Sequence, residues 1–296
     1  MQKFFKKLWR IITSPLRLMF WILKQFGKFF ARIWGGIKRF FTEEPDDTPL
    51  GDVVQSVIED PSGILYHLGE LRKHIFRIIV AVLLCSAISF IFITDIMDWI
   101  ASPIGGISEL QAIEVTEPIG IVMRITFLTG FTVALPYIVF ELILFLAPGI
   151  SRKSRMIGVF SIPLVTMFFI GGLMFSYYLV VPVAMPVLLN FMGIPTLPTP
   201  SSYMKFVTGL MFWIGVSFEF PLVIYLLAAM RIIKAEVLVK NWRIAVVVMS
   251  LAAAMITPTV DPINMAIVLI PLCILYGLGI LMAFLGGGKK TKISKA

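Results

Sequence analysis

Four acidic residues in or beside long apolar stretches are the side chains of this sequence best suited to bind a cation. Glu70 stands in His67-Leu68-Gly69-Glu70-Leu71-Arg72, directly ahead of a long apolar run. Glu141 and Glu219 lie inside later apolar runs, and Asp261 stands between the last two. An ionised group inside a bilayer costs on the order of 3 kcal/mol on insertion scales, so such residues usually have a function.

Each acid also has a plain structural interpretation. Glu70 at a helix start is favoured by the helix macrodipole, and Glu141 either snorkels to water or faces a groove. Asp261, between two prolines, can cap the last helix. Glu219 lies in the middle of a span, where a protonated carboxyl can donate a hydrogen bond to a partner helix, and there the functional interpretation is favoured.

The remaining polar chemistry is sparse. Cys85 and Cys273 lie inside apolar runs and are expected to be packing residues. His67 and His74 have no metal-ligand partner at useful spacing. Since a phosphate loop, a nucleophile elbow and a carboxylate pair are also missing from the sequence, it predicts neither an enzyme nor a metal or cofactor site.

The composition is that of an all-α, multi-pass membrane protein. Of 296 residues, 58% are hydrophobic and 15% are charged, and mean hydropathy is +0.94. A helix needs about 20 apolar residues to cross a bilayer. Six spans are predicted, of which the fifth is marginal in length, near residues 75–95, 119–146, 157–185, 205–230, 244–256 and 263–285. Prolines in these runs favour curved helices and a cupped bundle.

The basic residues predict the orientation of these spans. The first loop is acidic, and lysine and arginine fall on alternate loops and on the C-terminal tail. The positive-inside rule then places both termini in the cytoplasm, with the bundle in the cytoplasmic (inner) membrane. The net charge of +9 is therefore explained by topology and contact with anionic lipid, and nucleic acid is not an expected partner.

The chain divides into four predicted segments. Residues 1–43 interleave ten basic residues with aromatic ones and carry no acid before Glu43, which predicts an amphipathic helix at the membrane interface. Residues 44–60 read as an acidic linker, residues 61–285 as the six-helix domain, and residues 286–296 as a basic cytoplasmic tail.

Several motifs in order resemble those of the TatC family, the twin-arginine protein translocase subunits. They are His67-Leu68-Gly69-Glu70-Leu71-Arg72, Thr116-Glu117-Pro118, Phe145-Leu146-Ala147-Pro148-Gly149, Phe218-Glu219-Phe220-Pro221 and Thr257-Pro258-Thr259-Val260-Asp261-Pro262. The resemblance covers about residues 61–285 and leaves residues 1–60 outside.

The resemblance implies a receptor for the Arg-Arg signal peptides of folded proteins. Such a receptor works with TatA-type or TatB-type single-span partners, uses the proton motive force, needs no cofactor and self-associates in a larger complex. Glu70, with Arg72, then matches the signal-peptide site, because a carboxylate binds a guanidinium bidentately. Glu219, with Phe218 and Pro221, would contact a partner helix. The resemblance gives a structural role, mainly on the outer side, to Pro103, Glu117, Pro148 and Asp261.

One position departs from the family pattern. The family usually carries a second glutamate shortly after Ala-Pro, and here Ser154 stands there among Arg152, Lys153 and Arg155. We hypothesise that Glu141, where the family more often has an amide, supplies the missing acid. His74 also stands where a basic residue is common, which changes the end of the first motif.

Two other functions remain open on the sequence alone. One is a divergent TatC-like assembly scaffold that no longer reads arginines, which Ser154 and its basic loop favour. The other is a proton-coupled small-molecule transporter with Glu219 as the titrating group, which would require a polar lining that the spans lack. The cargo, the copy number, the number of partner types and the role of residues 1–43 are not encoded in any motif.

Overall fold

The structure, a computed structural model, describes residues 61–107, 110, 112–147, 152–190, 198–229, 233–257 and 262–286. Every described residue belongs to one compact unit of the chain, residues 50–296. The predicted interfacial segment 1–43, the linker 44–60 and the tail beyond Gly286 lie outside the described residues. So do Pro148 and Asp261, while Ser154 is described in its backbone only.

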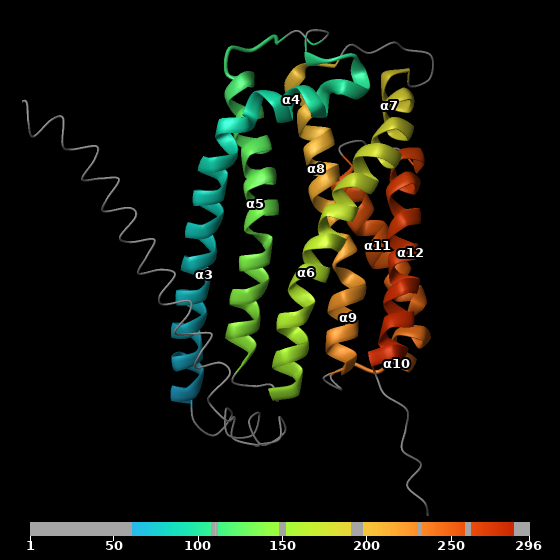
Figure 1. Cartoon of the computed structure of the whole chain (residues 1–296). Coiled ribbons are helices and arrows are strands. Elements are labelled where there is room, and N and C mark those ends of the chain that lie inside the picture. Colours follow the sequence, from blue (N-terminus) through green and yellow to red (C-terminus); the bar gives the residue numbers. More distant parts are fainter. Residues whose placement is uncertain are drawn as a thin grey trace, which may run out of the picture. The chain divides into compact units, whose positions relative to one another are not determined.

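The described residues form helices and no strands (Figure 1). The α-helices are α3 (Pro61–Ser89), α4 (Ile93–Ala101), α5 (Glu117–Leu146), α6 (Arg152–Phe175), α7 (Val181–Leu189), α8 (Pro200–Phe218), α9 (Phe220–Ala229), α10 (Ala235–Lys240), α11 (Trp242–Ile256) and α12 (Pro262–Gly286). Short 3₁₀ turns, η1 (Phe90–Phe92) and η2 (Ser102–Ile104), flank α4, and a π-helical turn, η5 (Ser176–Val180), joins α6 to α7. The all-helical prediction is confirmed for this part of the chain.

Within the described residues, five helical stretches are long and apolar enough to cross a membrane. They are Gly69–Ile104, Glu117–Leu146, Arg155–Leu189, Pro200–Ala229 and Met265–Gly286. The fifth predicted span corresponds to α11, which is apolar but has only 15 residues. Its length is below the roughly 20 residues of an ordinary span, as its sequence indicated.

Prolines explain the two breaks in these spans. Pro221 cannot donate a backbone hydrogen bond and its ring crowds the carbonyl of Ser217, so α8 ends at Phe218 and α9 begins at Phe220. Glu219 occupies the break. The π-helical turn likewise lies just before Pro182, where the helical ladder must be rearranged.

Tyrosine side chains hold α4 across one end of the helices, which we call the α4 end (Figure 1). The Tyr203 hydroxyl on α8 donates to the Ile100 carbonyl at 2.9 Å. The Tyr177 hydroxyl donates to the Trp99 carbonyl at 2.5 Å, so Ser102, 2.7 Å away, donates to Tyr177. The opposite end, where α3 begins and α5 ends, is called the Glu70 end.

The α3–α5 seam, the line along which α3 packs antiparallel to α5, is the contact that matters most for the site. Val82 packs on Ala134 and Ile138 in its middle. Farther toward the α4 end, Gly130 meets Ser86 so closely that an added Cβ would stand 2.6 Å from the Ser86 Cα and N atoms. Small residues of this kind allow close approach of membrane helices.

Gly130→Ala is therefore expected to force α3 away from α5 and to lower the free energy of unfolding by about 1–3 kcal/mol, the usual cost of overpacking. Thermal unfolding of the purified protein, followed by circular dichroism, measures this. Gly120→Ala on the same helix is the matched control, because a Cβ there meets nothing within 4 Å. Equal stability of the two variants would contradict the close approach.

Candidate functional site

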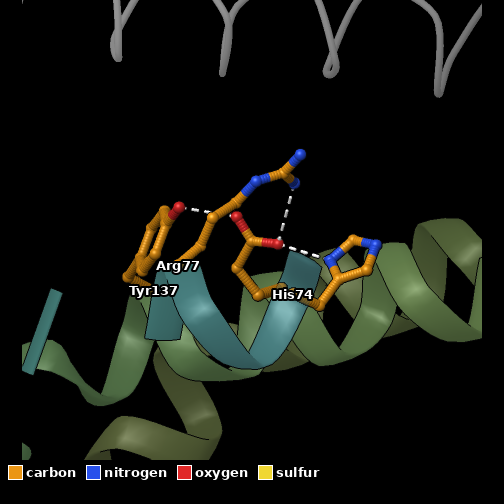
Figure 2. Close-up of polar contacts among 4 residues, drawn as sticks. His74, Arg77 and Tyr137 are labelled. Atoms are coloured by element: carbon orange, nitrogen blue, oxygen red, sulfur yellow. Dashed lines mark hydrogen bonds and ion pairs between the residues drawn. The ribbon is translucent and has the colours of Figure 1, made fainter. Parts of the chain in front are cut away.

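Glu141 is the centre of a buried polar cluster between α3 and α5. The Tyr137 hydroxyl donates to Glu141 Oε1 at 2.5 Å. His74 Nδ1 lies 2.5 Å from Oε2, and Arg77 Nη1 donates to the same oxygen at 3.3 Å. Figure 2 shows His74, Arg77 and Tyr137 converging on this carboxylate. We call these four residues the Glu141 cluster.

Helical spacing explains how the cluster forms. His74 and Arg77 are three residues apart on α3 and share a face, and Tyr137 precedes Glu141 by one turn of α5. The seam therefore turns from apolar, at Val82 and Ala134, to polar toward the Glu70 end.

The same register places Glu70. It precedes His74 by one turn on the same face of α3, about 6 Å closer to the helix start. His74 also contacts the Phe145 ring edge-on, with centroids 5.9 Å apart. Glu70, which is half-buried, thus lies level with the last residues of α5. The first motif and the Phe145-Leu146-Ala147 motif, far apart in sequence, meet at this end.

The burial of the cluster decreases from Glu141 outward. The Glu141 side chain is 2% exposed, that of His74 15% and that of Arg77 37%. A carboxylate has about four acceptor positions on its two oxygens, and three are taken here. A bidentate guanidinium needs both oxygens on one open edge, which Glu141 does not offer in this arrangement.

The other residues predicted around the signal-peptide site are only partly placed. Arg72 is exposed on α3, near Glu70 in the same helix. Arg155, which the sequence placed in a basic loop, is part of α6 and only 7% exposed. Ser154 precedes it in the same helix, so the second half of the predicted loop is the first turn of α6.

Glu219 is the second buried carboxyl of the described chain, and its situation is the opposite. Both of its carboxyl oxygens are buried and neither has a hydrogen-bond partner. The Phe169 backbone on α6 lies near it without reaching hydrogen-bond geometry. Phe218 stacks at an angle on Phe175 of α6, with centroids 5.4 Å apart, and Pro221 is buried. No hydrogen-bond partner for either oxygen is found within the described part of the chain.

The structural residues predicted for the outer side fall at the α4 end where they are described. Pro103 is exposed in η2, and Glu117 begins α5, with one carboxyl oxygen buried and lacking a hydrogen bond. The structure thus separates these residues from Glu70 by the length of the helices.

Sequence reasoning named Glu141 but missed Arg77 and Tyr137. Both carried a signal: Arg77 lies two turns after Glu70 on one face of α3, and Tyr137 lies one turn before Glu141. The sequence did not show that α3 packs on α5. Helical periodicity shows which residues share one face of a helix, but it does not show which other helix contacts that face.

Tyr137→Phe is expected to destabilise the protein by about 1.5–3 kcal/mol, the range for a hydrogen bond to a charged group. Chemical unfolding in micelles measures the loss. Tyr178→Phe serves as control, since Tyr178 is 61% exposed and makes no hydrogen bond in the described chain. A loss no larger than that of the control would mean that the Tyr137 hydroxyl does not stabilise the carboxylate.

Comparison with known proteins agrees with the resemblance to the TatC family that the sequence motifs indicated. The profile of the family described as Sec-independent protein translocase protein (TatC) matches residues 66–271. The Sec-independent protein translocase protein TatC of Carboxydothermus hydrogenoformans is 31% identical over 228 residues, 76% of this chain and 94% of that protein. That of Deinococcus radiodurans is 29% identical over 248 residues, 81% of this chain and 91% of that protein.

A solved structure shares the fold as well. The crystal structure described as twin arginine translocase receptor TatC aligns with a TM-score of 0.65 and 28% identity, over 75% of this chain and all of that one. By these matches the chain belongs to the TatC family of Sec-independent protein translocase proteins.

Proposed function

We propose that this protein is the core subunit of a twin-arginine translocase, which binds Arg-Arg signal peptides of folded proteins at Glu70 and exports those proteins with the proton motive force. The observation that carries the proposal is the position of Glu70. Its carboxylate stands at the end of the α3–α5 seam, where the first motif meets the end of α5.

The described charges support a topology with the Glu70 end in the cytoplasm. That end carries Arg72, Lys73, Lys234, Lys240 and Arg243, whereas the α4 end carries Asp95, Asp98 and Glu114. Under the positive-inside rule, both termini are cytoplasmic if α11 crosses as a short fifth span, which makes six spans in all. The bundle then lies in the inner membrane, with residues 1–43 at the lipid interface.

The chemistry of Glu70 suits an arginine code. A guanidinium presents donors in a fork that matches a carboxylate, and lysine cannot reproduce that geometry. Arg72, Glu141 and Ser154 complete the proposed signal-peptide region. Because Ser154 stands where the family usually has a second glutamate, this region has one carboxylate fewer. We therefore expect recognition of the Arg-Arg signal peptide to depend heavily on Glu70.

Glu219 is proposed to contact the helix of a TatA-type or TatB-type partner. Its two buried, unpartnered oxygens make it suited to a polar group brought by another helix, because an unsatisfied buried group is costly. Pro221 makes the helix break at which this carboxyl lies, and Phe218 is proposed to contact the partner helix beside it. Pro103, Glu117 and Asp261 are proposed to stabilise the opposite side, and Pro148, which follows the end of α5 in the sequence, is proposed to have a structural role.

Photocrosslinking to a twin-arginine precursor tests the receptor function. A photoreactive residue beside Glu70 should give crosslinks that fall at least tenfold, about 1.4 kcal/mol of binding, with a Lys-Lys leader or with Glu70→Gln. Glu236→Gln is the matched control, an exposed acid at the same end. Crosslinks that do not distinguish the leaders, with small single-span partners still bound, would favour the assembly scaffold instead.

Co-purification tests the role of Glu219. Glu219→Ala should reduce the amount of single-span partner recovered with the protein several-fold and leave leader crosslinking intact. Ser217→Ala is the control, since the Ser217 hydroxyl bonds only within its own helix, to the Trp213 carbonyl. Unchanged partner recovery in the Glu219 variant would remove this residue from the contact.

A further inference from the structure

We propose that Glu141 is a positioning residue: through His74 and Arg77 it holds the start of α3 against α5 and so places the Glu70 carboxylate, and it does not itself touch the leader. This inference rests on the proposed function, because it concerns how the same site reads arginine. It also revises the hypothesis that Glu141 replaces the missing loop acid.

The first step is the state of the Glu141 carboxylate. Both oxygens are engaged, Oε1 by Tyr137 and Oε2 by His74 and Arg77, and the side chain is 2% exposed. It lies five residues before the end of α5, roughly 7.5 Å along the helix axis. A leader arginine would have to enter the seam and displace Arg77 to reach it.

The second step is how little else supports α3. Only 6% of the most apolar window of its span is buried, and α5 is the one helix against which α3 packs extensively in the described chain. At the Glu70 end that contact is polar. The rotation and lateral position of α3 around residues 70–77 therefore depend to a large extent on the bonds that Glu141 makes, with the ring contact between His74 and Phe145 beside them.

The third step is the link to Glu70. Glu70, His74 and Arg77 follow at intervals of four and three residues, on one face of one helix. Whatever turns or shifts His74 and Arg77 moves Glu70 with them. Removal of the Glu141 charge would leave Arg77 without its carboxylate at a partly buried site, which strongly favours rearrangement.

Double-mutant cycles distinguish positioning from direct contact. The measured quantity is the Kd of a fluorescent twin-arginine leader peptide for the purified full chain in lipid nanodiscs, followed by anisotropy, with a Lys-Lys peptide as reference. Glu141→Gln should weaken binding on the order of tenfold. In a Glu70→Gln background the same change should have no further effect, because the carboxylate it positions is already gone.

The partners in the cluster provide the second cycle. The losses of affinity caused by Glu141→Gln and Arg77→Gln should not add, because both substitutions break the same contact between Arg77 and Glu141. Arg77→Lys should recover part of the affinity that is lost in Arg77→Gln. Lys73→Gln is the matched control, an exposed cation on the same turn of α3, and its effect should add to that of Glu141→Gln.

Hydrogen exchange gives a readout that does not depend on the leader. Glu141→Gln should speed exchange of the amides of residues 70–77 and leave α8 and α12 unchanged. Tyr137→Phe is a milder change at the same carboxylate. It should also speed exchange of residues 70–77 and weaken binding of the Arg-Arg peptide, and it can be measured if Glu141→Gln does not fold.

Three results would overturn the inference. The first is full affinity with Glu141→Gln, and the second is a loss that adds to that of Glu70→Gln, which would mark Glu141 as a direct contact. The third is unchanged exchange in α3. Failure of the proposed function has a different signature: the unaltered chain would then bind Arg-Arg and Lys-Lys leaders equally, which would overturn both.

Discussion

The burial of a carboxylate between two membrane helices is the constraint on which the rest of this site depends. Glu141 is almost wholly removed from solvent, and a charge in that position must be paired and fully hydrogen-bonded. Tyr137 contributes from within α5, whereas the contacts of His74 and Arg77 require this register of α3 against α5. Apolar residues alone would define the register of α3 against α5 only loosely. The Glu141 carboxylate gives this contact a definite register.

That register reaches both ends of the seam. Toward the α4 end, Gly130 and Ser86 bring the backbones close together, so α3 cannot slide without a clash. Toward the Glu70 end, the polar contacts determine where the first motif stands. α3 packs extensively on no other helix in the described chain. The position of Glu70, which we propose binds the Arg-Arg signal peptide, therefore depends on the α3–α5 seam.

Glu141 and Glu219 show that a glutamate within a membrane-spanning helix can have different roles. Glu141 has its partners within the chain, and its surroundings suit a structural task. Glu219 stands in a helix break made by Pro221, and neither of its oxygens has a partner. Because an unsatisfied buried group costs free energy, this carboxyl is suited to a donor or an acceptor from a partner helix, which is the role that we propose for it.

The sequence by itself determined much of this protein. Apolar run lengths gave the helices and the marginal length of α11, and motifs in series gave the family, because each of these signals is local. The prolines indicated bent helices, but the sequence analysis did not place the break beside Glu219. The sequence also named Glu70, Glu141 and Glu219. Only the tertiary structure decided that Glu141 faces α3, that Arg77 and Tyr137 join it, and that Arg155 is buried. Periodicity tells which residues share one helix face, whereas the partner of that face depends on how separate helices pack.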